Sequence, residues 1–230
     1  MPNVSVIIPA AGSGRRFGSA QNKIFQQLAG REIFLRTIDA FASRSDVTQI
    51  QLVVSVIDEQ IILDRFSREL DAANVSLCHG GLIRTQSVAN ALARVRPACD
   101  LVAIHDAVRP CIAPSLIDAV FDAAAADGAA ILAVPLHGTI KRVASGLISQ
   151  TVPRHDLYEA QTPQVFARDL IIRAFDAAPP DQADITDDAQ LVEAIGHPVR
   201  VILGDPRNIK ITAPADLALA EAIWPSITAR

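Results

Sequence analysis

Short apolar runs alternate with amphipathic helical segments along most of this 230-residue chain. Residues 4–8 form a continuous apolar run, which is typical of a strand buried on both faces. Residues 31–42 then place Phe34, Ile38 and Phe41 on one side of a helix. The same patterns predict strands at 49–56, 75–78, 101–104, 129–134 and 199–203, and helices at 59–72, 85–95, 114–126, 168–177, 186–195 and 214–223. This order predicts an α/β fold, a Rossmann-like three-layer sandwich with a mostly parallel sheet.

The alternation breaks at two short runs that we predict to be strands, residues 140–143 and 147–151, which flank Ser145 and Gly146. Two such runs around a turn pair predict a β-hairpin. Because neither run fits the order of the main sheet, we expect the hairpin to project from the domain as an arm, at about residues 136–153.

Length and composition bound the class of protein. Half of the residues are apolar, which allows a substantial core, so we expect one domain over residues 1–230. A net charge of −4 argues against a general nucleic-acid binder, and an anionic ligand would need a local basic site. The cysteines Cys78, Cys99 and Cys111 lack metal-site or disulfide spacing, which is typical of a reducing cytoplasm. Neither a secretory leader nor a membrane-spanning run is recognisable, so we expect a cytoplasmic protein without a membrane partner.

A glycine-rich, doubly basic loop follows the first predicted strand. Ligands of open α/β sheets collect beyond the carboxyl ends of the strands, where this loop lies. Gly12 and Gly14 allow backbone N–H groups to approach an anion, and Arg15 and Arg16 add charge-assisted hydrogen bonds. The glycine spacing matches neither G-x-G-x-x-G nor a Walker A loop. The loop therefore predicts a phosphate site of another kind, and a plain turn with solvent-facing arginines is its alternative.

Further motifs follow this loop in chain order. They are Lys23, Gly80-Gly81-x-x-Arg84-x-x-Ser87-Val88, His105-Asp106-Ala107-Val108-Arg109-Pro110, Gln161-Thr162-Pro163-Gln164, Thr186-Asp187-Asp188 and Asn208-Ile209-Lys210-Ile211-Thr212. With Pro9-Ala10-Ala11-Gly12-x-Gly14-x-Arg16, the set resembles the 2-C-methyl-D-erythritol 4-phosphate cytidylyltransferase family, within the sugar-phosphate nucleotidyltransferase superfamily. The resemblance covers nearly the whole chain, and the ordered set is far more specific than any one member.

The resemblance implies an enzyme of the non-mevalonate isoprenoid pathway. It would transfer a cytidylyl group from CTP to a polyol phosphate, 2-C-methyl-D-erythritol 4-phosphate, and release pyrophosphate. It also implies Mg²⁺ or another hard divalent cation, and a homodimer clasped by the hairpin arm. A phosphate monoester is already nucleophilic near neutral pH, so the protein has to align two polyanions and stabilise the charge that develops.

The resemblance also implies roles for particular residues. Catalytic roles fall to Arg16, Lys23, Arg154 and Lys210. Nucleotide contacts fall to Ala10, Ala11, Gly12, Gly14, Gly81, Arg84, Ser87, Asp106 and Ala107. Substrate contacts fall to Arg109, Thr139, Arg154, Thr162 and Lys210. Asp106, at the end of a buried strand, is also the implied metal ligand, whereas His105 is expected to be structural.

Some residues depart from the family pattern and leave alternatives open. Gly138 stands where an aspartate usually precedes the hairpin threonine, and Leu82 replaces a usual acidic residue. The acceptor could therefore be another polyol phosphate, such as ribitol 5-phosphate. A nucleotide-binding module without catalysis is a further alternative. Whether Arg84 contacts phosphate or braces its loop is also open.

Overall fold

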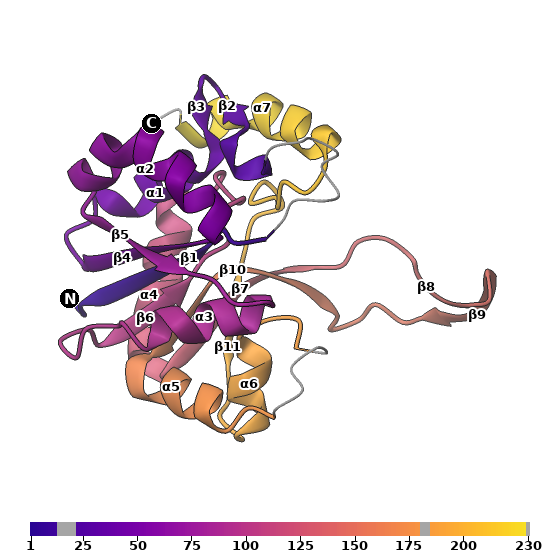
Figure 1. Ribbon diagram of the computed structural model, residues 1–230. Helices are drawn as coiled ribbons and strands as arrows, with labels where there is room; N and C mark the ends of the chain where they lie inside the picture. The colour runs from indigo at the N-terminus through magenta and orange to yellow at the C-terminus, as the bar shows by residue number, and fades with distance from the viewer. Residues whose placement is uncertain (13–21, 180–184, 229–230) are drawn as a thin grey trace.

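The computed structural model describes residues 1–12, 22–179 and 185–228, and its centre is a seven-stranded sheet (Figure 1). In spatial order the strands are β11 (Arg200–Leu203), β7 (Ala129–Pro135), β10 (Tyr158–Ala167), β6 (Leu101–Ile104), β1 (Val4–Pro9), β4 (Val47–Val54) and β5 (Val75–His79). β10 runs antiparallel to β6 and β7, and the other neighbouring pairs are parallel. The predicted α/β fold with a mostly parallel sheet is confirmed.

Helices cover both faces of the sheet, as the alternation of strand side chains requires. In β1, Val4, Val6 and Ile8 enter one apolar cluster, and Ile7 enters the other. The first cluster contains α1 (Ile33–Ala42), α2 (Val56–Ala72), α4 (Pro114–Asp127) and α7 (Pro214–Thr228). The second contains α3 (Arg84–Leu92), α5 (Arg168–Asp176) and α6 (Ala189–Ala194). No helix in the described ranges is both long enough and apolar enough to cross a membrane.

The antiparallel strand β10 was not predicted from the sequence. Its middle holds Gln161, Pro163 and Gln164, which interrupt any apolar run, and proline normally argues against a central strand. The ladder to β7 is broken between Ala160 and Gln164, so the proline occupies a position that needs no ladder hydrogen bond there. Tertiary pairing with β6 and β7 therefore makes a strand of a segment whose local pattern does not indicate one.

Two helix starts also differ from the prediction. α6 begins at Ala189 and not at residue 186, where the helix was predicted to start. The side-chain oxygen of Gln164 accepts hydrogen bonds from the backbone N–H groups of Asp188 and Ala189, so β10 supplies the partner for this helix end. α2 begins earlier than expected, because the Ser55 hydroxyl caps it by accepting from the N–H of Asp58.

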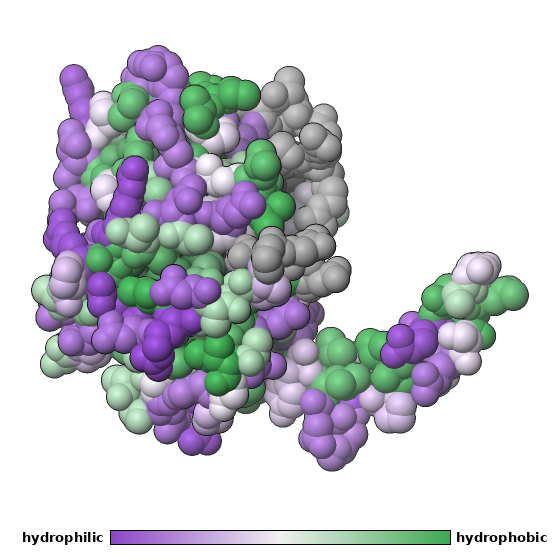
Figure 2. Space-filling view, turned by 60° about the horizontal axis from the view of Figure 1, so that its bottom comes forward, coloured by the Kyte–Doolittle hydropathy of each residue, from purple (hydrophilic) through white to green (hydrophobic). Residues whose placement is uncertain are grey.

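The predicted hairpin, β8 (Ile140–Ala144) and β9 (Leu147–Val152), projects far from the body of the molecule (Figure 1). Ser145 and Gly146 both adopt positive φ, which matches the tight turn that joins twisted antiparallel strands. Val143, Leu147 and Ile148 are exposed there, and Figure 2 shows apolar surface near the far end of this arm.

Candidate active site

The parallel strands β1, β5 and β6 end at one edge of the sheet, and the segments that follow them enclose a cavity of about 230 Å³. This first cavity is lined by Pro9, Ala10, Ala11, Gly12, Lys23, Ile24, Gly81, Leu82, Ile83, Arg84, Ser87, Asp106, Ala107, Val108 and Lys210. It therefore contains every predicted nucleotide residue that the structure describes. Gly14 and the predicted catalytic Arg16 lie outside the described residues.

A second cavity of about 230 Å³ adjoins the first. It is lined by Arg84, Asp106, Arg109, Ala160, Gln161, Thr162, Gln164, Thr186, Asp187 and Lys210. Arg84, Asp106 and Lys210 line both cavities, so they stand at the boundary between them. Two ligands bound side by side would meet at these three charged groups.

Asp106 organises the charge at this boundary. Its carboxylate lies 2.9 Å from Nζ of Lys210, 3.3 Å from Nε of Arg109 and 3.7 Å from Nε of Arg84. Burial by itself raises the pKa of Asp106, but the nearby cations outweigh burial and hold that pKa far below its ordinary value. The carboxylate is therefore ionised at neutral pH, and it gathers three cations where a phosphate could lie.

Arg84 is held by a buried carboxylate, that of Asp188. Its Nη1 and Nη2 donate to the two carboxylate oxygens of Asp188 at 3.0 and 2.8 Å. Asp188 is buried, which raises its pKa even though Arg84 acts in the opposite direction. Arg84 thus ties the start of α3 to the residue that precedes α6, and it also lines both cavities.

Close backbone approach shapes the wall of the first cavity. A Cβ on Gly80 would overlap the Cβ of Ala11 and lie 2.9 Å from Oγ of Ser87, so only glycine fits there. The Ser87 hydroxyl accepts from the N–H of Gly81 and donates to the carbonyl of Ile83. Small residues and one buried hydroxyl therefore hold two loops together at this wall.

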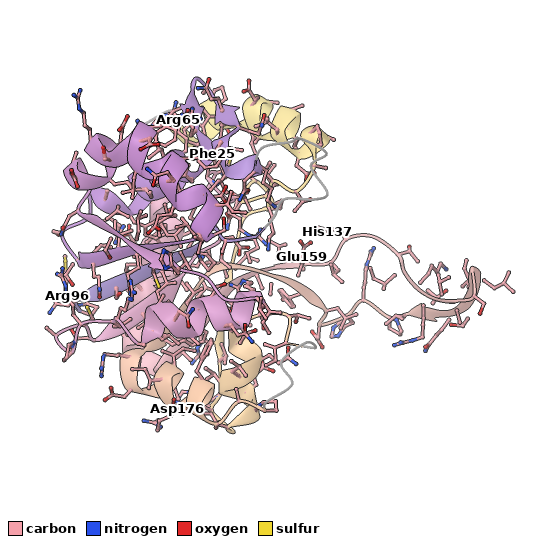
Figure 3. The ribbon with its side chains drawn as sticks, in the orientation of Figure 1. Phe25, Arg65, Arg96, His137, Glu159 and Asp176 are labelled. Atoms are coloured by element: carbon pink, nitrogen blue, oxygen red, sulfur yellow. The ribbon has the colours of Figure 1, made fainter. Side chains whose placement is uncertain are left out.

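Lys23 begins a short 3-10 turn, η2 (Lys23–Phe25), whose position is held from both ends. The Asn22 side chain donates to the carbonyl of Gly12 and to the carboxylate of Asp58. Phe25 packs with its ring centroid 6.0 Å from Phe34, inside the layer of α1 and α2 (Figure 3). These contacts keep Lys23 at the rim of the first cavity.

Two predicted substrate residues lie away from these cavities. Within the described part of the chain, Thr139 and Arg154 line neither of them. Nη1 of Arg154 donates to the carbonyl of His137. Figure 3 shows His137 and Glu159 where the arm leaves the body, which locates this contact at the root of the arm.

Gln161 and Gln164 received no role from the sequence, although both belong to a quoted motif. Gln161 Nε2 donates to the carbonyl of Asp205, which ties the segment before Lys210 to β10. Gln164 caps α6 and also donates to Asp187. Both glutamines lie at the break in the pairing of β10 with β7, and that position would have indicated a structural role for them. The sequence could not reveal it, because β10 itself was not predicted.

Among the described residues, no group of three or more histidine, cysteine or acidic side chains is placed to hold a metal. Asp106 is the one carboxylate that the described chain contributes to the first cavity. Mg²⁺ at phosphate sites takes one or two carboxylates together with phosphate oxygens. These residues fit a cation carried mainly by a polyphosphate, with Asp106 as its protein ligand.

The family model for 2-C-methyl-D-erythritol 4-phosphate cytidylyltransferase matches residues 4–226. The chain belongs to this family. A cytidylyltransferase of this description from Rhodopirellula baltica is 47% identical over 96% of this chain and 94% of its own length. One from Solibacter usitatus is 42% identical over 94% of this chain and 93% of its own.

Solved structures of family members have the same fold. The 4-diphosphocytidyl-2C-methyl-D-erythritol synthase of Anaerococcus prevotii aligns with a TM-score of 0.82 and 29% identity, over 97% of this chain and 96% of that one. The 2-C-methyl-D-erythritol 4-phosphate cytidylyltransferase of Thermus thermophilus aligns with a TM-score of 0.79 and 32% identity, over 96% and 98%. The family resemblance drawn from the motifs is confirmed.

Proposed function

We propose that this chain transfers a cytidylyl group from CTP to 2-C-methyl-D-erythritol 4-phosphate. The products are 4-diphosphocytidyl-2-C-methyl-D-erythritol and pyrophosphate, in non-mevalonate isoprenoid biosynthesis. The observation that carries the proposal is the pair of adjoining cavities that share Arg84, Asp106 and Lys210. Membership of the family supports this reaction over transfer to another polyol phosphate.

CTP occupies the first cavity in this proposal. The small residues Ala10, Ala11 and Gly81 leave room for a base, and nearby backbone groups and the Ser87 hydroxyl can read its edge. The triphosphate extends towards Lys23 and Lys210, which line the same cavity. Gly12, and by the family pattern Gly14 and Arg16, complete the phosphate cradle.

The acceptor phosphate lies in the second cavity, beside Arg109 and Lys210. One of its oxygens attacks the α-phosphorus of CTP. The bond from that phosphorus to the bridging oxygen breaks, and pyrophosphate leaves with the electron pair. Cations at the boundary lower the barrier because they contact the charge that shifts towards the leaving group. The same cations hold both substrates in line, which removes much of the entropic cost of the encounter.

Mg²⁺ or another hard divalent cation, bound by phosphate oxygens and Asp106, would neutralise charge on the triphosphate. The protein's own part is to keep Asp106 ionised, which the surrounding cations do by lowering its pKa. Lys210 can then exchange its contact with Asp106 for contacts with incoming phosphate oxygens.

We also propose that the arm at about residues 136–153 clasps a second copy of the chain, within a single nucleotidyltransferase domain of residues 1–230. Val143, Leu147 and Ile148 are exposed on the arm, which suits burial against a partner (Figure 2). Thr139 and Arg154 would then contact the substrate phosphate at the partner's site.

Three free cysteines in the described residues support a reducing, cytoplasmic setting.

The test is an acceptor panel. The full chain is incubated with CTP, MgCl₂ and either 2-C-methyl-D-erythritol 4-phosphate or ribitol 5-phosphate, and pyrophosphate release is measured. We expect release with the first acceptor; release with ribitol 5-phosphate alone would overturn the proposal. A Lys23→Ala variant that binds CTP normally and turns over as fast as wild type would remove Lys23 from the catalytic set.

A further inference from the structure

His105 is a fully buried side chain to which the proposed reaction assigns no part. Both of its ring nitrogens have partners. Nε2 lies 3.0 Å from the carbonyl oxygen of Arg109, and Nδ1 lies 3.1 Å from Oγ1 of Thr162. The ring also packs in an edge contact on Phe41, with centroids 5.2 Å apart. The imidazole is therefore held in one orientation at the end of β6.

The partners of the two nitrogens decide which one carries the proton. A backbone carbonyl only accepts hydrogen bonds, so Nε2 must be the protonated nitrogen. The ring is fully buried, and its two hydrogen bonds are to a carbonyl and a hydroxyl, an environment that favours the neutral form near pH 7. Nδ1 is then an acceptor, and the hydroxyl of Thr162 donates to it.

This arrangement also decides what Thr162 can offer a ligand. Its Oγ1 already accepts a hydrogen bond from the N–H of Asp106 at 3.1 Å. A hydroxyl has one hydrogen and two lone pairs, so a single lone pair is left. Thr162 lines the second cavity, where Arg84, Arg109 and Lys210 offer hydrogen-bond donors. The carboxylates of that cavity are already engaged, Asp106 by these three cations and Asp187 by Gln164 and Gln190.

We propose that His105 is a positioning residue that makes Thr162 a hydrogen-bond acceptor for one hydroxyl of the acceptor substrate. The inference rests on the proposed function and adds the orientation of the acceptor substrate in the second cavity. Phosphate oxygens accept hydrogen bonds, so they avoid the lone pair of Thr162 and bind to the cations. The polyol end carries hydroxyl donors, so one of them binds at Thr162. The second cavity thus selects a substrate with a phosphate at one end and a hydroxyl within reach of Thr162.

Two substitutions of His105 separate this role from a structural one. His105→Asn keeps an acceptor near the position of Nδ1, whereas His105→Gln keeps a donor near Nε2 and releases the Thr162 hydroxyl. Losing one neutral hydrogen bond corresponds to about a threefold to tenfold change. We expect His105→Gln to raise the KM for 2-C-methyl-D-erythritol 4-phosphate by that factor, with the KM for CTP unchanged, and His105→Asn to leave both near wild type.

Thr162 provides a second matched pair. Thr162→Val removes the hydroxyl and is expected to raise the KM for the acceptor. Thr162→Ser retains the hydroxyl, so we expect a lower KM for the acceptor than in Thr162→Val. Equal effects of His105→Gln and His105→Asn, or an equal rise in the KM for CTP, would show that His105 only supports the fold.

The tautomer can be read without any activity. Nitrogen NMR of the imidazole rings in the full wild-type chain distinguishes a protonated Nε2 from a protonated Nδ1. We expect His105 to show a protonated Nε2 and a bare Nδ1 near pH 7, and a protonated Nδ1 would overturn the inference. This spectrum requires no turnover. If no acceptor in the panel released pyrophosphate, that result would count against the proposed reaction, whereas the position of the proton on His105 would still be decided by the spectrum.

Discussion

Nζ of Lys210 lies 2.9 Å from Oδ2 of Asp106, at the boundary between two cavities. Asp106 follows the central strand β6, whereas Lys210 lies beyond the edge strand β11, so the contact joins distant parts of the sheet. Arg109 strengthens it by donating from Nη1 to the carbonyl of Asn208, which holds the segment that carries Lys210. The cation is thereby positioned before any phosphate arrives, which reduces the reorganisation that the reaction requires.

Replacing Lys210 tests this boundary directly. We expect Lys210→Met to lower kcat by about 100-fold, the usual effect of losing one donor that stabilises developing charge. Steady-state pyrophosphate release measures it. Arg96→Gln, which changes an exposed cation remote from both cavities (Figure 3), is the control and should keep wild-type kcat. Equal losses in the two variants would contradict a specific role for Lys210.

The ion pair of Arg84 and Asp188 predicts a loss of stability. Asp188→Asn leaves the Arg84 guanidinium without its buried partner, and breaking buried pairs costs about 3–5 kcal/mol. Arg84 keeps 31% of its side chain exposed, so we expect a smaller loss, about 2 kcal/mol, by urea unfolding. Asp127→Asn breaks an exposed pair with Arg200 and should leave the unfolding midpoint unchanged. A wild-type midpoint for Asp188→Asn would show that the buried pair adds nothing.

Gly80 predicts a selective effect on nucleotide binding. In Gly80→Ala the new methyl group would overlap the Cβ of Ala11, so the two loops of the first cavity must separate. We expect the Kd for CTP, measured by calorimetry, to rise at least about tenfold, which is equivalent to about 1.4 kcal/mol. Gly138→Ala meets nothing within 4 Å and controls for the effect of an added methyl group. Normal CTP affinity in Gly80→Ala would show that the loops adjust freely.

Asp216 predicts a pH-dependent contribution to stability. Its Oδ2 accepts hydrogen bonds from Thr212 Oγ1 and from the N–H groups of Thr212 and Ala213, which caps α7. The bonds from Thr212 lower the pKa of Asp216, so its contribution is present above the unfolded pKa of about 4 and is lost as pH falls through the folded value.

We therefore expect Asp216→Ala to lower the free energy of unfolding by about 1 kcal/mol at pH 7. The difference from wild type should shrink as the pH falls below about 4. Chemical unfolding at a series of pH values measures both effects. Asp122→Ala, on the exposed part of α4, is the matched control. A difference that stays constant down to low pH would contradict the assignment to the ionised carboxylate.

The arm predicts an oligomeric state. Replacing Val143, Leu147 and Ile148 together with serine removes the exposed apolar side chains from the arm and leaves the main sheet unchanged. We expect wild type to behave as a dimer in light scattering, and the triple variant as a monomer with reduced activity. A wild-type monomer with full activity would contradict both the clasp and the proposed roles of Thr139 and Arg154.

Local patterns in the sequence were enough to predict most of the fold. The apolar run of β1 and the helical spacing of α1 identify the layers, because side-chain periodicity reflects which face each element buries. The family resemblance of the motifs that follow β1, β5 and β6 implied nucleotide contacts at residues that line the first cavity. The meeting of these motifs at one place has a physical reason. Parallel strands bring their carboxyl ends to one edge, so loops distant in sequence must meet there.

Only the tertiary structure decided how the second cavity is built. β10 becomes a strand because β6 and β7 supply its hydrogen-bond partners on both sides, although Pro163 argues locally against one. Its Gln164 then caps α6, and its Thr162 meets His105. These contacts join residues whose local sequence carries no periodic signal. They form because buried polar groups must find partners, and only the folded chain brings those partners within reach.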